Sequence, residues 1–149
     1  MTSPSDTMRA RLWRELSSLR TGMLGLADRE THAQPMTAHF DRPDGPVWFI
    51  ARAESPLLAS ARKGADAMFT YVARGHDMYA CVGGRLTADP DRTVLDRYWT
   101  PEVARWFGDK NAAALLRFEP RDGQAWIPGE SADACDLSFQ GQGQQSSVA

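Results

Sequence analysis

The sequence predicts a mainly β protein, a small β-barrel with peripheral helices, and two observations carry that prediction. Short segments rich in β-branched and aromatic residues recur along the chain, and most of them are separated by turn residues rather than by helices. A parallel α/β fold would need a helix between most strands, and the first three strands have none between them. We therefore expect a closed barrel of six strands. The strands are expected at 21–28, 33–40, 46–52, 65–73, 78–88 and, as one long or broken strand, 112–120 with 123–127.

Three residues within these strands predict local irregularity. Pro35 cannot donate a backbone hydrogen bond, so its strand is expected at an edge, at a bulge or at a position free of ladder pairing. Gly83 and Gly84 are expected to mark a bulge or a barrel corner. The turn before the third strand carries Pro, Asp and Gly, which are typical turn residues.

The helices are predicted from a repeated start signal, a capping residue followed by proline. It occurs at Ser3-Pro4, Ser55-Pro56, Asp89-Pro90 and Thr100-Pro101. The first helix has an apolar face and is expected to end near Gly22, while Gly64 and Gly108 are expected to stop two of the others.

The composition changes after residue 127, where the chain becomes rich in Gly, Gln and Ser. We expect residues 1–127 to form one split-barrel domain with an N-terminal helix, and residues 128–149 to form a polar C-terminal tail or arm.

The overall charge excludes several classes of partner. The 149 residues carry a formal net charge of −2, which gives no general attraction to nucleic acid or to anionic membranes. No apolar run approaches the ~20 residues that span a bilayer. Cys81 and Cys135 match no metal-binding spacing, which favours a reduced, cytoplasmic protein. The three histidines are isolated, so we expect no metal site and name no catalytic residue.

Ser55 and Pro56 begin a predicted short helix directly after the third strand. The start of a helix presents backbone N–H groups and the positive end of the helix dipole, which together can bind phosphate. Because Pro56 has no N–H, the donors would be the Ser55 hydroxyl and the backbone from Leu57 onward. An ordinary N-cap accounts for the same residues, and both interpretations stay open at this point.

Motifs from about residue 20 to residue 127 are similar to those of one known family. They are QPMT, VWFIA followed by ESPLLAS, YACVGGRLTADPDR, RYWTPEVARWFG, and LLRFEP with GQAWI. On these motifs the chain resembles the general-stress-protein branch of the pyridoxamine 5′-phosphate oxidase-like, FMN-binding split-barrel family. The resemblance implies a six-stranded FMN-binding split barrel.

The resemblance also implies a homodimer with FMN between its two barrels. Residues 34–36 would line one side of the flavin, residues 48–51 would bond the ring edge through their backbone, Ser55 would hold the phosphate, and Trp106 would approach from the partner subunit. The cofactor-binding residues that we take from it are Gln34, Pro35, Met36, Trp48, Phe49, Ile50, Ala51, Arg52, Ser55, Leu57 and Trp106.

The chain departs from the family pattern at three of these positions. Gln34 stands where an arginine is common, Leu57 where a lysine is common, and Ala51 where a threonine is frequent. Each lost charge-assisted contact should cost about 1.5–3 kcal/mol, or roughly ten- to a hundredfold in affinity. Weak FMN binding is therefore expected, with Arg52 as a candidate replacement cation.

The function that the resemblance implies is an FMN-binding general stress protein, a flavin-dependent oxidoreductase of unknown substrate. The alternative is a non-enzymatic dimeric split-barrel module with weak or lost flavin binding. A deazaflavin or a haem in the same cleft is a third option. A typical pyridoxamine phosphate oxidase is not expected, because the sequence shows no Arg/His cluster for a substrate phosphate.

Overall fold

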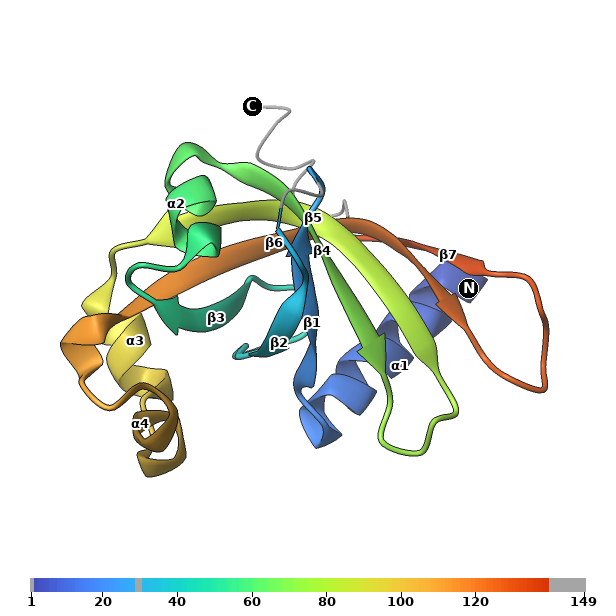
Figure 1. Ribbon diagram of the computed structural model, residues 1–149. Helices are drawn as coiled ribbons and strands as arrows, with labels where there is room; N and C mark the ends of the chain where they lie inside the picture. Colours follow the sequence, from blue (N-terminus) through green and yellow to red (C-terminus); the bar gives the residue numbers. More distant parts are fainter. Residues whose placement is uncertain (1, 29–30, 140–149) are drawn as a thin grey trace.

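A computed structural model describes residues 2–28 and 31–139 as one antiparallel sheet of seven strands with helices around it (Figure 1). The strands are β1 (Thr21–Leu26), β2 (Gln34–Thr37), β3 (Val47–Arg52), β4 (Ala65–Val72), β5 (Tyr79–Asp89), β6 (Ala113–Trp126) and β7 (Cys135–Ser138). The helices are α1 (Pro4–Ser18), α2 (Pro56–Lys63), α3 (Arg92–Tyr98) and α4 (Pro101–Phe107), with a 3-10 turn, η1, at Lys110–Ala112. The mainly β class with peripheral helices is confirmed.

The sheet is curved but not closed, so the expectation of a closed barrel is wrong. Its strand order is β2-β1-β4-β5-β6-β3, and β7 pairs with β6 outside this path. The two end strands, β2 and β3, meet only at an isolated bridge between His39 and Trp48 in the part of the chain that the structure describes. Within that bridge the His39 N–H donates to the Trp48 carbonyl at 2.9 Å, and the Trp48 N–H donates to the His39 carbonyl at 2.7 Å.

Alternation of side chains explains how the strands build the core. Along β4 the side chains of Ala67, Phe69 and Tyr71 are buried and the intervening ones are exposed. The long β5 and β6 pair over their whole length, with a register shift between Gly83 and Gly84, which confirms the predicted bulge. The shift is enforced at Gly84, where an added Cβ would lie 2.3 Å from the Glu119 carbonyl oxygen.

The seventh strand differs from the expectation for the C-terminal segment. Residues 135–138, expected to belong to a polar tail or arm, pair with β6, and Leu137 faces Gly123 across that pairing. Leu137 and Phe139 are 3% and 8% exposed and belong to the main core. The sheet therefore includes a strand beyond residue 127, and the burial of these two apolar side chains stabilises it. Residues 140–149 lie outside the described residues.

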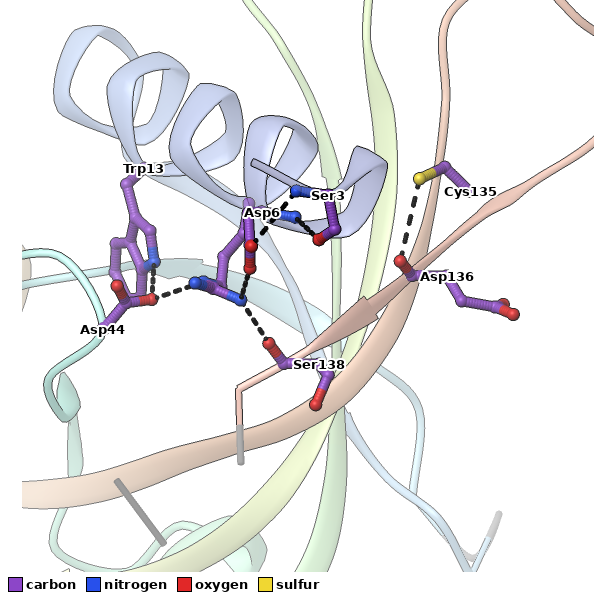
Figure 2. A network of polar contacts seen from close by, with 8 residues as sticks. Ser3, Asp6, Trp13, Asp44, Cys135, Asp136 and Ser138 are labelled. Carbon is purple, nitrogen blue, oxygen red and sulfur yellow. Dashed lines mark hydrogen bonds and ion pairs between the residues drawn. The ribbon is translucent and has the colours of Figure 1, made fainter. Parts of the chain in front are cut away.

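Helix α1 crosses the open side of the sheet near β7 (Figure 1). It ends at Ser18, one turn before the expected end near Gly22, because β1 begins at Thr21. Arg9 on this helix donates to the Ser138 carbonyl at 2.8 Å and pairs with Asp44 at 2.9 Å. Figure 2 shows Asp44 and Ser138 on the segments beside the helix. The Trp13 indole also donates to Asp44, at 3.0 Å, so one carboxylate ties α1 to the loop before β3.

The other helices lie at the opposite end of the sheet (Figure 1). α2 is capped by Ser55 and α4 by Thr100, as predicted. The third helix begins later than expected, with Asp91 as its cap in place of Asp89-Pro90. Asp89 instead accepts hydrogen bonds from the Asp91 N–H and the Trp48 indole. Among the described residues no helix is both long enough and apolar enough to cross a membrane.

Candidate functional site

The gap between β2 and β3 is the first feature of the candidate site, because both strands have an unpaired edge there. Hydrogen bonding alternates along a strand, so residues of the same parity as His39 and Trp48 turn their backbone groups toward this gap. Beyond the bridge, the residues whose backbone groups face the gap include Ile50 on β3 and Thr37 and Pro35 on β2. Pro35 contributes a carbonyl but no donor. The prediction that its strand lies at an edge is confirmed.

The predicted site residues of β3 are buried on both faces of the sheet. Phe49 and Ala51 point into the main core. Trp48 and Ile50 pack on the other face in a second cluster with Leu95, beneath α3 and α4. The side chains of β3 are thus occupied by packing, and only the strand's backbone edge can serve a ligand. Met36 is buried in the main core as well.

The start of α2 lies at the far end of this gap, and its backbone donors are already used. The Leu57 N–H donates to the Ser55 hydroxyl oxygen at 3.1 Å. The N–H groups of Leu58 and Ala59 donate to the Ser55 carbonyl at 3.1 and 3.2 Å, and the Ser55 N–H donates to Arg52. Pro56 has no N–H, and Leu57 is fully buried. Ser55 is therefore the N-cap of α2, and its binding of a phosphate stays a prediction.

Few charges lie near this helix start. Gln34 is neutral and half-buried at the end of β2, while Arg52 and Glu54 are both exposed on the segment that precedes Ser55. An exposed cation contributes about 0–1 kcal/mol to an ion pair, since water screens it. Arg52 is therefore a weak substitute for a phosphate-binding cluster, and Glu54 beside it opposes an anion.

An open cavity of the described residues lies elsewhere, on the outward face of β1, β4 and β5. It has a volume of about 640 Å³ and shares only Pro35 with the predicted site. Its lining is uncharged and mostly apolar: Thr21, Gly22, Met23, Pro35, Thr70, Tyr71, Val72, Tyr79, Ala80, Cys81 and Trp126. Burial raises the pKa of the Cys81 thiol, so this cysteine stays protonated. Sequence reasoning missed this cavity, although outward-facing Met68, Val72 and Tyr79 alternate with core residues in a way that could have revealed it.

Exposed large apolar side chains gather on that same face. Met23, Met68, Val72 and Tyr79 are each about 40% exposed, whereas a fifth such residue, Trp106, lies on α4 with 78% of its surface exposed. The structure does not bring Trp106 together with the other predicted residues within one chain.

A polar cluster closes the gap at its bridged end. The His39 ring stacks on Tyr98 of α3 at a centroid distance of 4.9 Å, and the Tyr98 hydroxyl donates to Asp41. Burial and the neighbouring Arg20 charge lower the pKa of His39 to about 4, so its ring is neutral at pH 7. Burial and Asp41 raise the pKa of Tyr98 to about 12. These two rings hold α3 against the bridge, and neither of them titrates near neutral pH.

An antiparallel sheet that curls into a barrel but stays split between two edge strands defines this chain as a split-barrel protein. The family described as pyridoxamine 5′-phosphate oxidase like matches residues 7–140. The chain therefore belongs to that family.

Solved structures agree with this assignment. A protein assigned to the general stress family of Xanthomonas campestris pv. campestris is 36% identical, with a TM-score of 0.76 over 91% of this chain and 96% of that one. A general stress FMN/FAD binding protein of Xanthomonas citri is also 36% identical, with a TM-score of 0.74 over 87% and 94%. General Stress Protein 26 of Bacillus anthracis str. Sterne shares the fold at 18% identity, with a TM-score of 0.64 over 86% of this chain and 98% of that one. The two likenesses at 36% identity confirm the general-stress-protein branch. No significant match was found among curated proteins.

Proposed function

We propose that this protein binds a flavin between two copies of its chain and acts as a flavin-dependent oxidoreductase of the general stress class. The observation that carries the proposal is the gap between the edges of β2 and β3, which in the described residues pair only at the bridge between His39 and Trp48. Support also comes from the 36% identity to a protein named for FMN/FAD binding. FMN is the flavin that the family resemblance implies.

The two halves of FMN fit the residues present to different degrees. The ring suits the gap, because the backbone groups of Ile50 and the carbonyl of Pro35 can bond its polar edge. The phosphate does not suit the start of α2, where the backbone donors are used. When bound, a flavin would supply the electron transfer, and the chain would hold and orient it. We name no catalytic residue.

The homodimer is supported by the apolar outward face. Contiguous exposed apolar surface on a sheet is typical of an interface, and a two-fold axis pairs a patch with its own copy. Four large apolar side chains on this face, each about 40% exposed, would be covered by such a partner. We propose that Trp106 of one copy then lies near the flavin of the other. Both cysteines are free, which supports the cytoplasmic location expected from the sequence.

The dimer can be tested by sedimentation of Val72→Asp beside its isosteric control Val72→Thr. We expect the wild type and Val72→Thr to sediment at twice the 16.5 kDa chain mass at micromolar concentration, and Val72→Asp to sediment as a monomer. A charge at the centre of the face cannot be desolvated without a partner. A wild-type protein that sediments only as a monomer would contradict the shared flavin site.

The flavin can be tested by absorbance. Protein mixed with flavin and then desalted should keep visible flavin bands that bleach when a reductant is added. A colourless protein that shows no binding in a titration would instead favour the alternative, a dimeric module without a cofactor. The substitutions at Gln34, Ala51 and Leu57 are the observation that favours that second function.

A further inference from the structure

We infer that the site selects a flavin without a phosphate group, such as riboflavin, over FMN. The inference rests on the proposed function and goes beyond it by naming the chemical form of the ligand. FMN carries close to two negative charges at neutral pH, so a site that prefers it must offer donors or cations. Among the described residues, both are scarce at each place where the ligand could lie.

The first place is the start of α2. A helix N-terminus binds phosphate through N–H groups that have no intrahelical partner. Here the N–H groups of Leu57, Leu58 and Ala59 all donate to Ser55, through its hydroxyl or its carbonyl. A phosphate could displace the hydroxyl from Leu57 only by losing the N-cap, which costs about 1 kcal/mol. What remains is the hydroxyl proton of Ser55, a neutral donor.

The second consideration is the charge of the two strands that flank the gap. β2, β3 and the turn that leads to Ser55 contain one arginine, Arg52, and no lysine, and Glu54 offsets that single charge. Arg20 lies at the bridged end of the gap, where it donates to the Ala38 carbonyl, and Arg62 and Lys63 lie in the last turn of α2, away from Ser55. The position before Pro35 is the neutral Gln34, and the position two after Ser55 is Leu57, whose side chain is sealed in the core. Arg52 is therefore the only arginine or lysine on β2, β3 and that turn that could reach a phosphate.

The third consideration is the cavity on the outward face. None of its lining residues is charged, and Tyr79 and Trp126 lie opposite each other as register partners on β5 and β6. A flat, uncharged ring can stack against such side chains, whereas a dianion there would be desolvated without compensation. Whether the ring lies in the gap or reaches this cavity, the surroundings favour a neutral ligand.

The experiment is a pair of titrations of the full-length protein, one with riboflavin and one with FMN, at low and at high salt. Quenching of flavin fluorescence reports binding. We expect riboflavin to bind at least as tightly as FMN, with a ratio of dissociation constants that does not change with salt. FMN binding ten times tighter, with an advantage that falls as salt rises, would overturn the inference and leave the proposed function intact. Binding of neither flavin would overturn both.

Charge variants sharpen the test. Gln34→Arg introduces the missing cation, and Thr7→Arg places the same charge on an exposed position of α1, which contributes no residue to the gap or to the cavity lining. Gln34→Arg should tighten FMN by about ten- to a hundredfold and leave riboflavin unchanged. Thr7→Arg should change neither. An equal gain for both ligands, or a gain for neither, would contradict a preference set by missing charge.

Arg52→Ala measures the contribution of the cation on the segment that leads to Ser55. Because Arg52 is exposed, its removal should weaken FMN by no more than about fivefold, which corresponds to about 1 kcal/mol. A larger loss would mean that Arg52 forms a built phosphate site, and that result would overturn the inference.

Discussion

Replacing Leu137 by alanine tests whether the C-terminal strand is part of the folded barrel. Leu137 is 3% exposed and lies in the main core, which also contains Trp13 and Phe139. The change removes three buried carbon atoms, worth about 0.8 kcal/mol each. The cavity left behind adds about 1 kcal/mol, so the free energy of unfolding should fall by about 3 kcal/mol.

Urea denaturation at fixed protein concentration measures this loss. For a slope of about 2 kcal/mol per molar urea, the midpoint should fall by about 1.5 M. Asp136→Asn is the control, since Asp136 precedes Leu137 on the same strand and is exposed. Its midpoint should stay within about 0.2 M of the wild type, because surface changes are typically within ±0.5 kcal/mol. If Leu137→Ala behaves like this control, the packing of β7 on β6 is refuted.

Three further predictions follow from individual residues. Tyr71 and Tyr98 have pKa values raised to about 12. The free energy of unfolding should therefore be constant up to pH 10 and fall as the pH rises toward 12. Tyrosinate absorbance and unfolding, followed together, measure this. The pKa of His39 is lowered to about 4, so its contribution to stability is present above pH 6.5 and is lost as the pH falls toward 4. His39→Gln should reduce that pH dependence, and denaturation at several pH values measures it. Gly84→Ala should destabilise the fold by more than about 2 kcal/mol, because its Cβ would meet backbone. In Gly83→Ala the added Cβ would chiefly contact the movable Asp122 side chain, so this variant should lose less stability than Gly84→Ala. Equal thermal shifts for the two variants would contradict a clash with backbone as the cause.

Much of the fold could be predicted because its signals are local. Ser3, Ser55 and Thr100 cap helices as expected, since each cap depends only on a side chain and the next turn of backbone. β4 alternates cleanly between buried and exposed side chains. The bulge at Gly84 was predictable because glycine weakens a regular strand, so two adjacent glycines indicate a place where the ladder is interrupted.

The errors concern contacts between distant parts of the chain. Closure of the barrel depends on pairing between β2 and β3, and the sequence does not show that only His39 and Trp48 meet. The seventh strand was hidden by the polar composition around it, although Cys135, Leu137 and Phe139 alternate with polar residues and could have revealed it. For the third helix, both Asp89 and Asp91 are suitable capping residues, and the structure uses Asp91.

The candidate site was predictable only in part. Motifs predict its segments, and they predict that residues 48–51 bond the ring edge through their backbone. The motifs do not indicate that side chains such as Phe49 are sealed in the core. The apolar cavity depends on strands lying side by side, and its residues are scattered from Thr21 to Trp126. Whether the predicted residues bind a flavin stays a prediction.

Pro35 has a consequence for solubility that is separate from any ligand. An edge strand with free N–H groups invites strands of other molecules to add to it, and such addition leads to aggregates. Pro35 occupies the position on β2 where an N–H would point into the open gap, so a foreign strand would find a carbonyl there but no donor. Pro35 thereby protects the exposed edge of the split barrel.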